Sequence, residues 1–133
     1  MVCIHCGEKT HVINSRLQKR NNQTWRRRQC FACSAIFSTI EAPAYHSSWL
    51  VSHRTGVTEA FSRDKLLLSL YDSCSHRKHA LTDAGALADT IVRKLQEAVY
   101  NGSLDAKAII QTAQVVLNRF DKAASVRYAA LHS

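Results

Sequence analysis

Four cysteines near the start of the chain occur as two C-x-x-C pairs, Cys3 with Cys6 and Cys30 with Cys33. Each pair can place two thiolates on one side of a tetrahedral zinc ion, and two pairs complete a closed shell with no open position for a substrate. The 23 residues between Cys6 and Cys30 slightly exceed the usual gap, which a longer hairpin would explain. The pattern therefore predicts a structural Zn²⁺ site with these four ligands.

Two other uses of the cysteines are two disulfides or a redox pair. Disulfides suit a secreted chain, and the start Met1-Val2-Cys3 has neither the charged nor the apolar region of a signal peptide. A thioredoxin-like pair would require a βαβ context, which the pattern does not indicate. No apolar run approaches the length of a membrane span. We therefore favour zinc and expect a soluble, intracellular protein with no membrane partner.

The basic residues are concentrated in the first third of the chain. Residues 1–41 carry seven basic side chains against two acidic ones, so they supply +5 of the formal net charge of +8. A small, strongly basic module beside a nearly neutral remainder is typical of proteins that bind nucleic acid. A solvated face is the alternative interpretation of such a charge run.

The residues around the cysteines predict a three-stranded ribbon. Thr10–Ser15 and Gln23–Gln29 are the first two expected strands, and Lys19–Asn22 supplies the turn. Ala35–Ile40 is the third, and it is expected to cover the interior of the ribbon with Ile36 and Phe37.

The second expected strand carries the residues best suited to contact DNA. Side chains alternate along a strand, so Arg26 and Arg28 share one face while Arg27 shares the other with Trp25. Arginine can bind a phosphate with two hydrogen bonds or form a fork with guanine, and Trp25 adds an apolar surface. The strand is thus expected to present guanidinium groups on both faces.

The remainder of the chain predicts a β-hairpin followed by four helices. A short linker is expected at Glu41–Ser48, where the single proline lies, and the hairpin comprises Trp49–Val51 and Val57–Phe61. Ser62 is the expected N-cap of the first helix, Thr82 caps the second and Ser103 begins the third. The apolar stripes of these three helices are Leu66, Leu67, Leu70 and Cys74, then Leu87, Ile91, Leu95 and Val99, then Ile109, Ala113, Val116, Leu117 and Phe120.

The remaining features of the second half are its last helix, the fifth cysteine and a short basic run. Asp121–Leu131 is expected to be helical with Val126 and Leu131 facing inward. Cys74 is interpreted as a small buried side chain rather than a nucleophile. The run His76–His79 is interpreted as the basic end of a helix rather than a second metal site.

Ordered motifs in both halves resemble one known family. The first half has Cys3-Ile4-His5-Cys6, Val12-Ile13-Asn14-Ser15-Arg16, Arg26-Arg27-Arg28-Gln29-Cys30, Cys33 and Phe37-Ser38-Thr39-Ile40-Glu41. The second half has Gly56-x-x-Glu59-x-Phe61-x-x-x-Lys65-Leu66, and then Asp121-Lys122 leading to Val126-Arg127-Tyr128-Ala129. These motifs resemble the NrdR repressors of ribonucleotide reductase genes, which join a zinc ribbon to an ATP-cone.

The resemblance implies the fold and the domains. The fold class is α+β, a small three-stranded zinc ribbon followed by an α-rich ATP-cone with a β-hairpin and about four helices. The expected domains are residues 1–42, which bind DNA, and residues 49–133, which bind nucleotide. The expected DNA-contacting residues are Arg16, Trp25, Arg26, Arg27 and Arg28.

The resemblance also implies a nucleotide site in the second half. Arg54 and Lys65 would hold phosphates near the start of a helix, where backbone amides also attract anions. Glu59 and Phe61 would shape the nucleoside end. His53 stands where the family usually has lysine, and the alternative is that the charged residues form surface ion pairs.

The function implied is a cytoplasmic, nucleoid-associated bacterial repressor that is not an enzyme. Its expected partners are double-stranded promoter DNA, the regulatory ligands ATP and dATP, and further copies of the chain in a homo-oligomer. A second reading is a zinc-ribbon nucleic-acid binder whose helical half only dimerises or contacts another protein. An enzyme is the weakest reading, because no paired carboxylates, catalytic triad or open metal site is evident.

Overall fold

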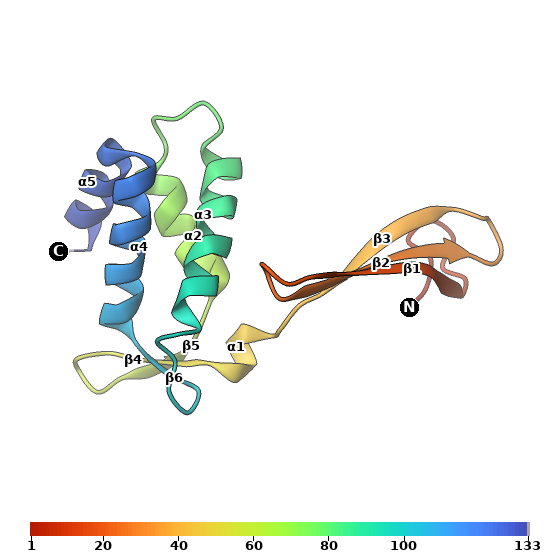
Figure 1. Ribbon diagram of the computed structural model, residues 1–133, viewed down its shortest axis with the longest axis horizontal. Coiled ribbons are helices and arrows are strands. Elements are labelled where there is room, and N and C mark those ends of the chain that lie inside the picture. Colours follow the sequence, from red (N-terminus) through yellow and green to blue (C-terminus); the bar gives the residue numbers. More distant parts are fainter. Residues whose placement is uncertain (133) are drawn as a thin grey trace. The chain divides into compact units, whose positions relative to one another are not determined.

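The computed structural model describes residues 1–132 and divides into two compact units, Met1–Pro43 and the chain from Ala44 onward (Figure 1). The first unit is a three-stranded sheet with the four cysteines, and the second is helical with a small sheet. The α+β prediction is therefore confirmed. The predicted domain bounds, residues 1–42 and 49–133, and the roles of the two domains stay predictions, and position 133 lies outside the described residues. No described helix is long and apolar enough to cross a bilayer.

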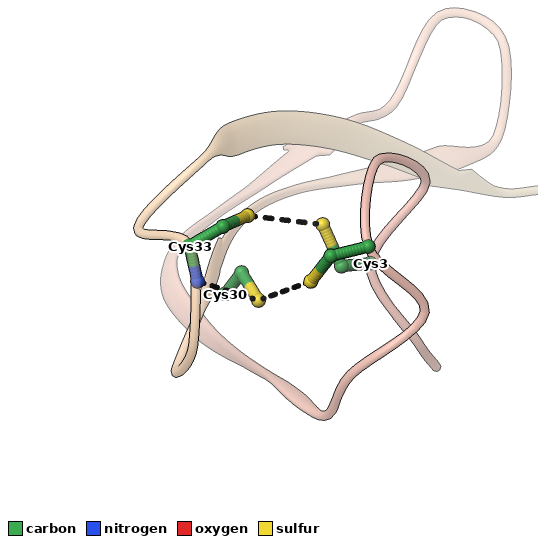
Figure 2. A group of neighbouring side chains, drawn as sticks. Cys3, Cys30 and Cys33 are labelled. Carbon is green, nitrogen blue, oxygen red and sulfur yellow. Dashed lines mark hydrogen bonds between the residues drawn. The ribbon is translucent and has the colours of Figure 1, made fainter.

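The ribbon consists of β1 (Thr10–Gln18), β2 (Gln23–Cys30) and β3 (Ile36–Glu41), paired antiparallel with β2 in the centre. β1 continues to Gln18, beyond the predicted end at Ser15, because its last residues pair with the start of β2. The register of β1 shifts between Val12 and Asn14, where one residue bulges. Cys3, Cys6 and Cys33 lie in or beside turns, and Cys30 is the last residue of β2. Figure 2 shows Cys3, Cys30 and Cys33 facing one another.

The interior of the ribbon is very small. Its buried residues are Cys3, Cys30 and Phe37, with the partly buried Ala35 packed against them. The inward position of Phe37 is confirmed, but the prediction for Ile36 is wrong, because Ile36 is 46% exposed. Neighbouring strand residues face opposite sides, so Ile36 and Phe37 cannot both point inward. Such a core is too small to hold the ribbon together without another cross-link.

The second unit begins with α1 (Tyr45–Ser48) inside the segment expected to be a linker. The linker prediction is wrong for that part, because three aromatic side chains pack together there. The rings of Tyr45 and Trp49 are 4.5 Å apart, and those of Trp49 and Phe61 are 5.3 Å apart. Trp49 is buried and ends α1 instead of opening a strand. This cluster anchors the entry to the second unit.

A three-stranded sheet of order β5-β4-β6 follows, formed by β4 (Leu50–Ser52), β5 (Thr58–Ala60) and β6 (Ser103–Asp105). The predicted hairpin is confirmed as the antiparallel pair of β4 and β5, and Gly56 in its turn has φ +87°, which favours glycine. β6 was not predicted. It pairs parallel to β4, so Ser103 lies in a strand rather than at a helix start.

The predicted four helices are α2 (Arg63–Ser73), α3 (Ala80–Leu95), α4 (Ala106–Phe120) and α5 (Lys122–Leu131). Ser62 caps α2 as predicted, with its Oγ accepting the backbone N–H of Lys65 at 3.1 Å. The cap predicted at Thr82 and the helix start predicted at Ser103 are wrong. α3 begins earlier, after His79, and α4 is capped by Asp105, whose carboxylate accepts the N–H of Lys107 at 2.9 Å.

The main core lies between the four helices and the sheet and includes Leu66, Leu70, Ile91 and Leu117. Cys74 is fully buried there, as predicted, and this burial raises the pKa of its thiol. The helix predicted at Asp121–Leu131 is present as α5, but the inward orientation predicted for Val126 and Leu131 is wrong, because they are 69% and 59% exposed. The buried residues of α5 are instead Ala124, Ser125 and Tyr128.

The segment after α2 forms an ion-pair network instead of a basic helix end. Arg77 donates to Asp83 and Asp121, both at 2.8 Å, and its guanidinium lies 4.4 Å from the centre of the Phe120 ring. Phe120, predicted to be buried, is 40% exposed, so that prediction is wrong. His76 also contacts Asp121, at 3.1 Å. The network ties the α2–α3 connection to the start of α5.

Replacing Asp121 by alanine is expected to destabilise the second unit by about 3 kcal/mol, because it removes the α5 cap and a charge-assisted partner of Arg77. The N–H of Ala124 and then the Arg77 guanidinium lower the pKa of the Asp121 carboxyl. The stabilisation is therefore fully present above the unfolded-state pKa and is lost as the pH falls toward the lower folded-state value.

Urea unfolding of the Asp121→Ala variant measures the loss of stability. Asp72→Ala is the control, since Asp72 is exposed on α2. Equal midpoints for both variants would contradict the role of the network.

Candidate metal centre, ribbon faces and pocket

The four cysteine sulfurs converge from two turns, with all Sγ atoms within 4.8 Å of one another (Figure 2). The Sγ atoms of Cys3 and Cys33 are 3.7 Å apart, and those of Cys6 and Cys30 are 3.4 Å apart. All four cysteines are free, which excludes the disulfide alternative for this structure. Four sulfurs at about 2.3 Å from a central zinc would be separated by about 3.8 Å. The donor set and its spacing therefore suit tetrahedral Zn²⁺.

Backbone amides prepare two of these sulfurs to be thiolates. The N–H of His5 points to Cys3 Sγ at 3.3 Å, and the N–H groups of Ala32 and Cys33 point to Cys30 Sγ at 3.3 and 3.5 Å. The His5 contact is the main reason that the pKa of Cys3 is lowered, and the Cys33 N–H is the main reason that the pKa of Cys30 falls to about 7. Thiolates are the form that binds zinc, so these backbone N–H groups favour the metal-binding form of Cys3 and Cys30.

The two faces of the ribbon differ in charge. On one face, Arg26 donates to Glu41 at 2.8 Å and Arg28 donates to Thr39 at 3.2 Å. Both arginines are partly buried, and Phe37 and Cys30 lie on the same side of the sheet. These two guanidinium groups are therefore engaged by β3 itself. β2 thus carries guanidinium groups on both faces, as the alternation predicts, but those of Arg26 and Arg28 are already engaged.

The opposite face, which we call the open face, carries the exposed side chains of Arg16, Trp25 and Arg27. Arg16 pairs in register with Trp25, and Asn14 pairs with Arg27, so the four residues form one compact block. No described residue on this face of the three strands is acidic, and the guanidinium groups of Arg16 and Arg27 have no partner within residues 1–132. The open face thus offers two free guanidinium groups with the indole of Trp25 next to both, across from Arg16 and two residues from Arg27.

The structure brings three of the five predicted nucleotide-site residues into one ion cluster. Glu59 on β5 accepts from His53 at 2.9 Å and from Lys65 at 3.0 Å. These contacts, His53 first and then Lys65, lower the pKa of the Glu59 carboxyl. Because a carboxylate only accepts, Nε2 of His53 carries the proton in this contact. Arg54 is exposed in the turn and is not part of the cluster.

A cavity of about 180 Å³ opens beside this cluster. Its walls are mainly apolar and include Phe61, Leu66, Ile109 and Tyr128, while His53, Glu59 and Lys65 lie at its polar side. A second hollow of about 750 Å³ shares His53, Ala106, Ile110 and His132 with the first and adds Arg54 and Lys107. The two together provide an apolar compartment next to one whose lining is mainly basic, with Arg54 and Lys107 but also the acidic Asp105. Arg54 therefore faces the second hollow, apart from Phe61.

Comparison with known proteins identifies the family. Residues 1–41 match the family described as "Transcriptional repressor NrdR-like, N-terminal domain", a zinc ribbon. Over the whole chain, the transcriptional repressor NrdR of Syntrophotalea carbinolica is 31% identical, covering 99% of this chain and 83% of that protein. The NrdR proteins of Opitutus terrae and Pelotomaculum thermopropionicum are each 32% identical and are covered over 86% and 79% of their length. The chain belongs to the NrdR family.

Membership in the NrdR family assigns a role in transcriptional repression rather than catalysis. It also identifies the first unit as a zinc ribbon, in agreement with the four converging sulfurs. The resemblance seen in the sequence is therefore confirmed. The individual DNA and nucleotide contacts predicted for this NrdR protein stay predictions.

Sequence reasoning missed several residues of the pocket. Tyr128 and His132 line the cavity from α5 and its end, and Ala106 and Ile109 line it from α4. The motif around Tyr128 was visible in the sequence as part of the NrdR resemblance, but nothing local connected it with β5. The packing of α5 against α4 and α2 is what brings it there.

Proposed function

We propose that this chain is a nucleotide-responsive repressor of ribonucleotide reductase genes that binds double-stranded promoter DNA through the open face of its zinc ribbon. The observation that carries the proposal is the block of Arg16, Trp25 and Arg27, which is exposed, free of acidic neighbours and part of a ribbon from a repressor family. Free guanidinium groups can bind phosphates or base edges, whereas Arg26 and Arg28 would first have to leave Glu41 and Thr39.

Zinc has a structural role in this proposal. Cys3, Cys6, Cys30 and Cys33 would hold the ion, and the ion would supply the cross-link that the small ribbon core lacks. Cys30 is the last residue of β2, so its place in the four-cysteine site fixes that end of the strand. The arginines of β2 are thereby presented on a rigid strand, which reduces the entropy lost when DNA binds.

The second unit would bind ATP or dATP in the paired compartments. The apolar cavity lined by Phe61 suits a nucleobase, and the basic hollow with Arg54 and Lys107 suits phosphates. Lys65 would also contact a phosphate, because its ammonium is held by Glu59 at the polar side of the apolar cavity. A nucleotide would shift the assembly of a homo-oligomer only as far as it binds one form more tightly than another.

Replacing Lys65 by alanine is expected to weaken ATP binding roughly tenfold, because a charge-assisted contact to phosphate would be lost. The fold should persist, since the Lys65 side chain is 69% exposed. Isothermal calorimetry with ATP and dATP measures the effect. Lys78→Ala is the control, because Lys78 is exposed and lines neither compartment. Unchanged affinity in Lys65→Ala, and also in Arg54→Ala, would show that the nucleotide site lies elsewhere.

The competing function is a zinc-ribbon DNA binder whose helical unit serves only for dimerisation or for protein contacts. It predicts DNA binding without any response to nucleotide. DNA binding and particle size measured with and without ATP or dATP therefore separate the two proposals. Location in the bacterial cytoplasm, at the nucleoid, follows from either one, because both require access to promoter DNA.

A further inference from the structure

Tyr128 is a buried side chain whose hydroxyl has no partner within the protein. The residue is only 1% exposed and lies on the inner face of α5. No hydrogen bond of its hydroxyl occurs within residues 1–132, although a buried tyrosine usually has one. Its ring is instead held by packing, with the ring of His132 at 4.2 Å. Burial raises its pKa to about 12, so the hydroxyl keeps its proton and can donate.

The hydroxyl oxygen has access to the apolar cavity. Among the described residues, the fully enclosed polar side-chain atoms without a partner are His11 Nδ1 and Gln114 Oε1. The Tyr128 oxygen is not one of them, so it must touch space that water can reach. Tyr128 lines the cavity beside Phe61 and Leu66 and is otherwise enclosed by the core. The cavity is therefore the space that this donor can reach.

We infer that the Tyr128 hydroxyl hydrogen-bonds the nucleobase of the bound nucleotide. This inference rests on the nucleotide site proposed above. The charged side chains lie at one side of the cavity and in the neighbouring hollow, so the phosphates are expected there and the base among the apolar walls. The ring nitrogens and the amino group of adenine can pair with a hydroxyl, which both donates and accepts.

The substitution that isolates this role is Tyr128→Phe, which removes one oxygen atom and keeps the ring. Because the hydroxyl has no partner within the described protein and lies where water can reach it, its removal should leave the melting temperature nearly unchanged. ATP affinity should nevertheless fall roughly three- to tenfold, the effect of one net hydrogen bond. A residue with only a structural role would not give these two results together.

The experiment is calorimetric titration of the zinc-loaded full chain with ATP and with dATP, together with thermal unfolding of the nucleotide-free protein. Tyr71→Phe is the matched control, because Tyr71 is 41% exposed on α2 and lines neither compartment. The expected result is a loss of affinity for both nucleotides in Tyr128→Phe and no change in Tyr71→Phe.

Two results would overturn the inference, and they differ from failure of the nucleotide site itself. An affinity of Tyr128→Phe within twofold of the native protein, while Lys65→Ala still binds less tightly, would show that the hydroxyl does not contact the base. A loss of affinity that accompanies a lower melting temperature would assign Tyr128 to the core alone. Absence of ATP and dATP binding in the native protein would overturn the nucleotide site, and this inference with it.

Discussion

Replacing Arg16 and Arg27 together by alanine is expected to weaken binding of double-stranded DNA roughly 100-fold, because two charge-assisted contacts of the open face are lost. If both side chains contact phosphates, the slope of log affinity against log salt should fall by about two units. Loss of slope without loss of sequence preference would indicate positioning contacts, and loss of both would indicate base readout. Fluorescence anisotropy with promoter DNA at several salt concentrations measures all three quantities.

The matched control is Arg26→Ala with Arg28→Ala, which removes the same charge from the opposite face of the same sheet. These arginines already bind Glu41 and Thr39, so their loss should weaken DNA binding less than tenfold. Zinc content is measured in all variants to exclude unfolding. Equal losses in the two double variants would mean that total charge, and not the open face, determines binding. A larger loss in the control would reverse our assignment of the faces.

Removal of zinc is expected to unfold the ribbon while the helical unit stays folded. Structural zinc contributes about 10–16 kcal/mol in small zinc modules, whereas the apolar interior of this ribbon is limited to three buried side chains and Ala35. Adding a strong chelator, or replacing Cys30 by serine, should therefore abolish the amide signals of β1 to β3 and DNA binding together. NMR spectra and metal analysis measure these effects, with one zinc per chain expected in the native protein.

Cys74→Ala is the control for the cysteine substitution. Cys74 lies in the core of the second unit, so its loss should leave the zinc content at one equivalent even if the helical unit becomes less stable. Protein that holds less than half an equivalent of zinc and still shows the ribbon signals would refute the structural role of the metal.

Local patterns in the sequence were sufficient for the features that depend on neighbouring residues. The C-x-x-C spacing predicted the converging sulfurs, the alternation along β2 separated Arg26 and Arg28 from Arg27, and Ser62 was recognisable as a cap. Each of these depends on the geometry of one strand or one turn. The same reasoning placed Ile36 and Phe37 on one side, which strand alternation itself forbids.

Features that depend on distant partners could not be predicted in this way. β6 is three residues long and pairs with β4, about 50 residues earlier, so no local pattern separates Ser103 from a helix cap. On α5 the small residues Ala124 and Ser125 face inward because α4 packs closely there, with Gln114 donating to Ser125 at 3.1 Å. The larger Val126 is therefore left outside.

The functional difference between the two ribbon faces has the same origin. The sequence shows three consecutive arginines, but only the register of β3 places Glu41 beside Arg26 and Thr39 beside Arg28. Likewise, the cavity needs β5, α4 and α5 together, so Tyr128 becomes a candidate ligand contact only in the folded unit.

The most direct test of the proposed function is the size and DNA affinity of the zinc-loaded chain measured with no nucleotide, with ATP and with dATP. Mass photometry gives the size of the particles, and anisotropy with promoter DNA and an unrelated duplex gives affinity and preference. We predict preferential binding of the promoter and an assembly state that differs between ATP and dATP. DNA binding is expected to be tighter with one of the two nucleotides than with the other. The same particle size and the same DNA affinity in all three conditions would contradict nucleotide-responsive repression.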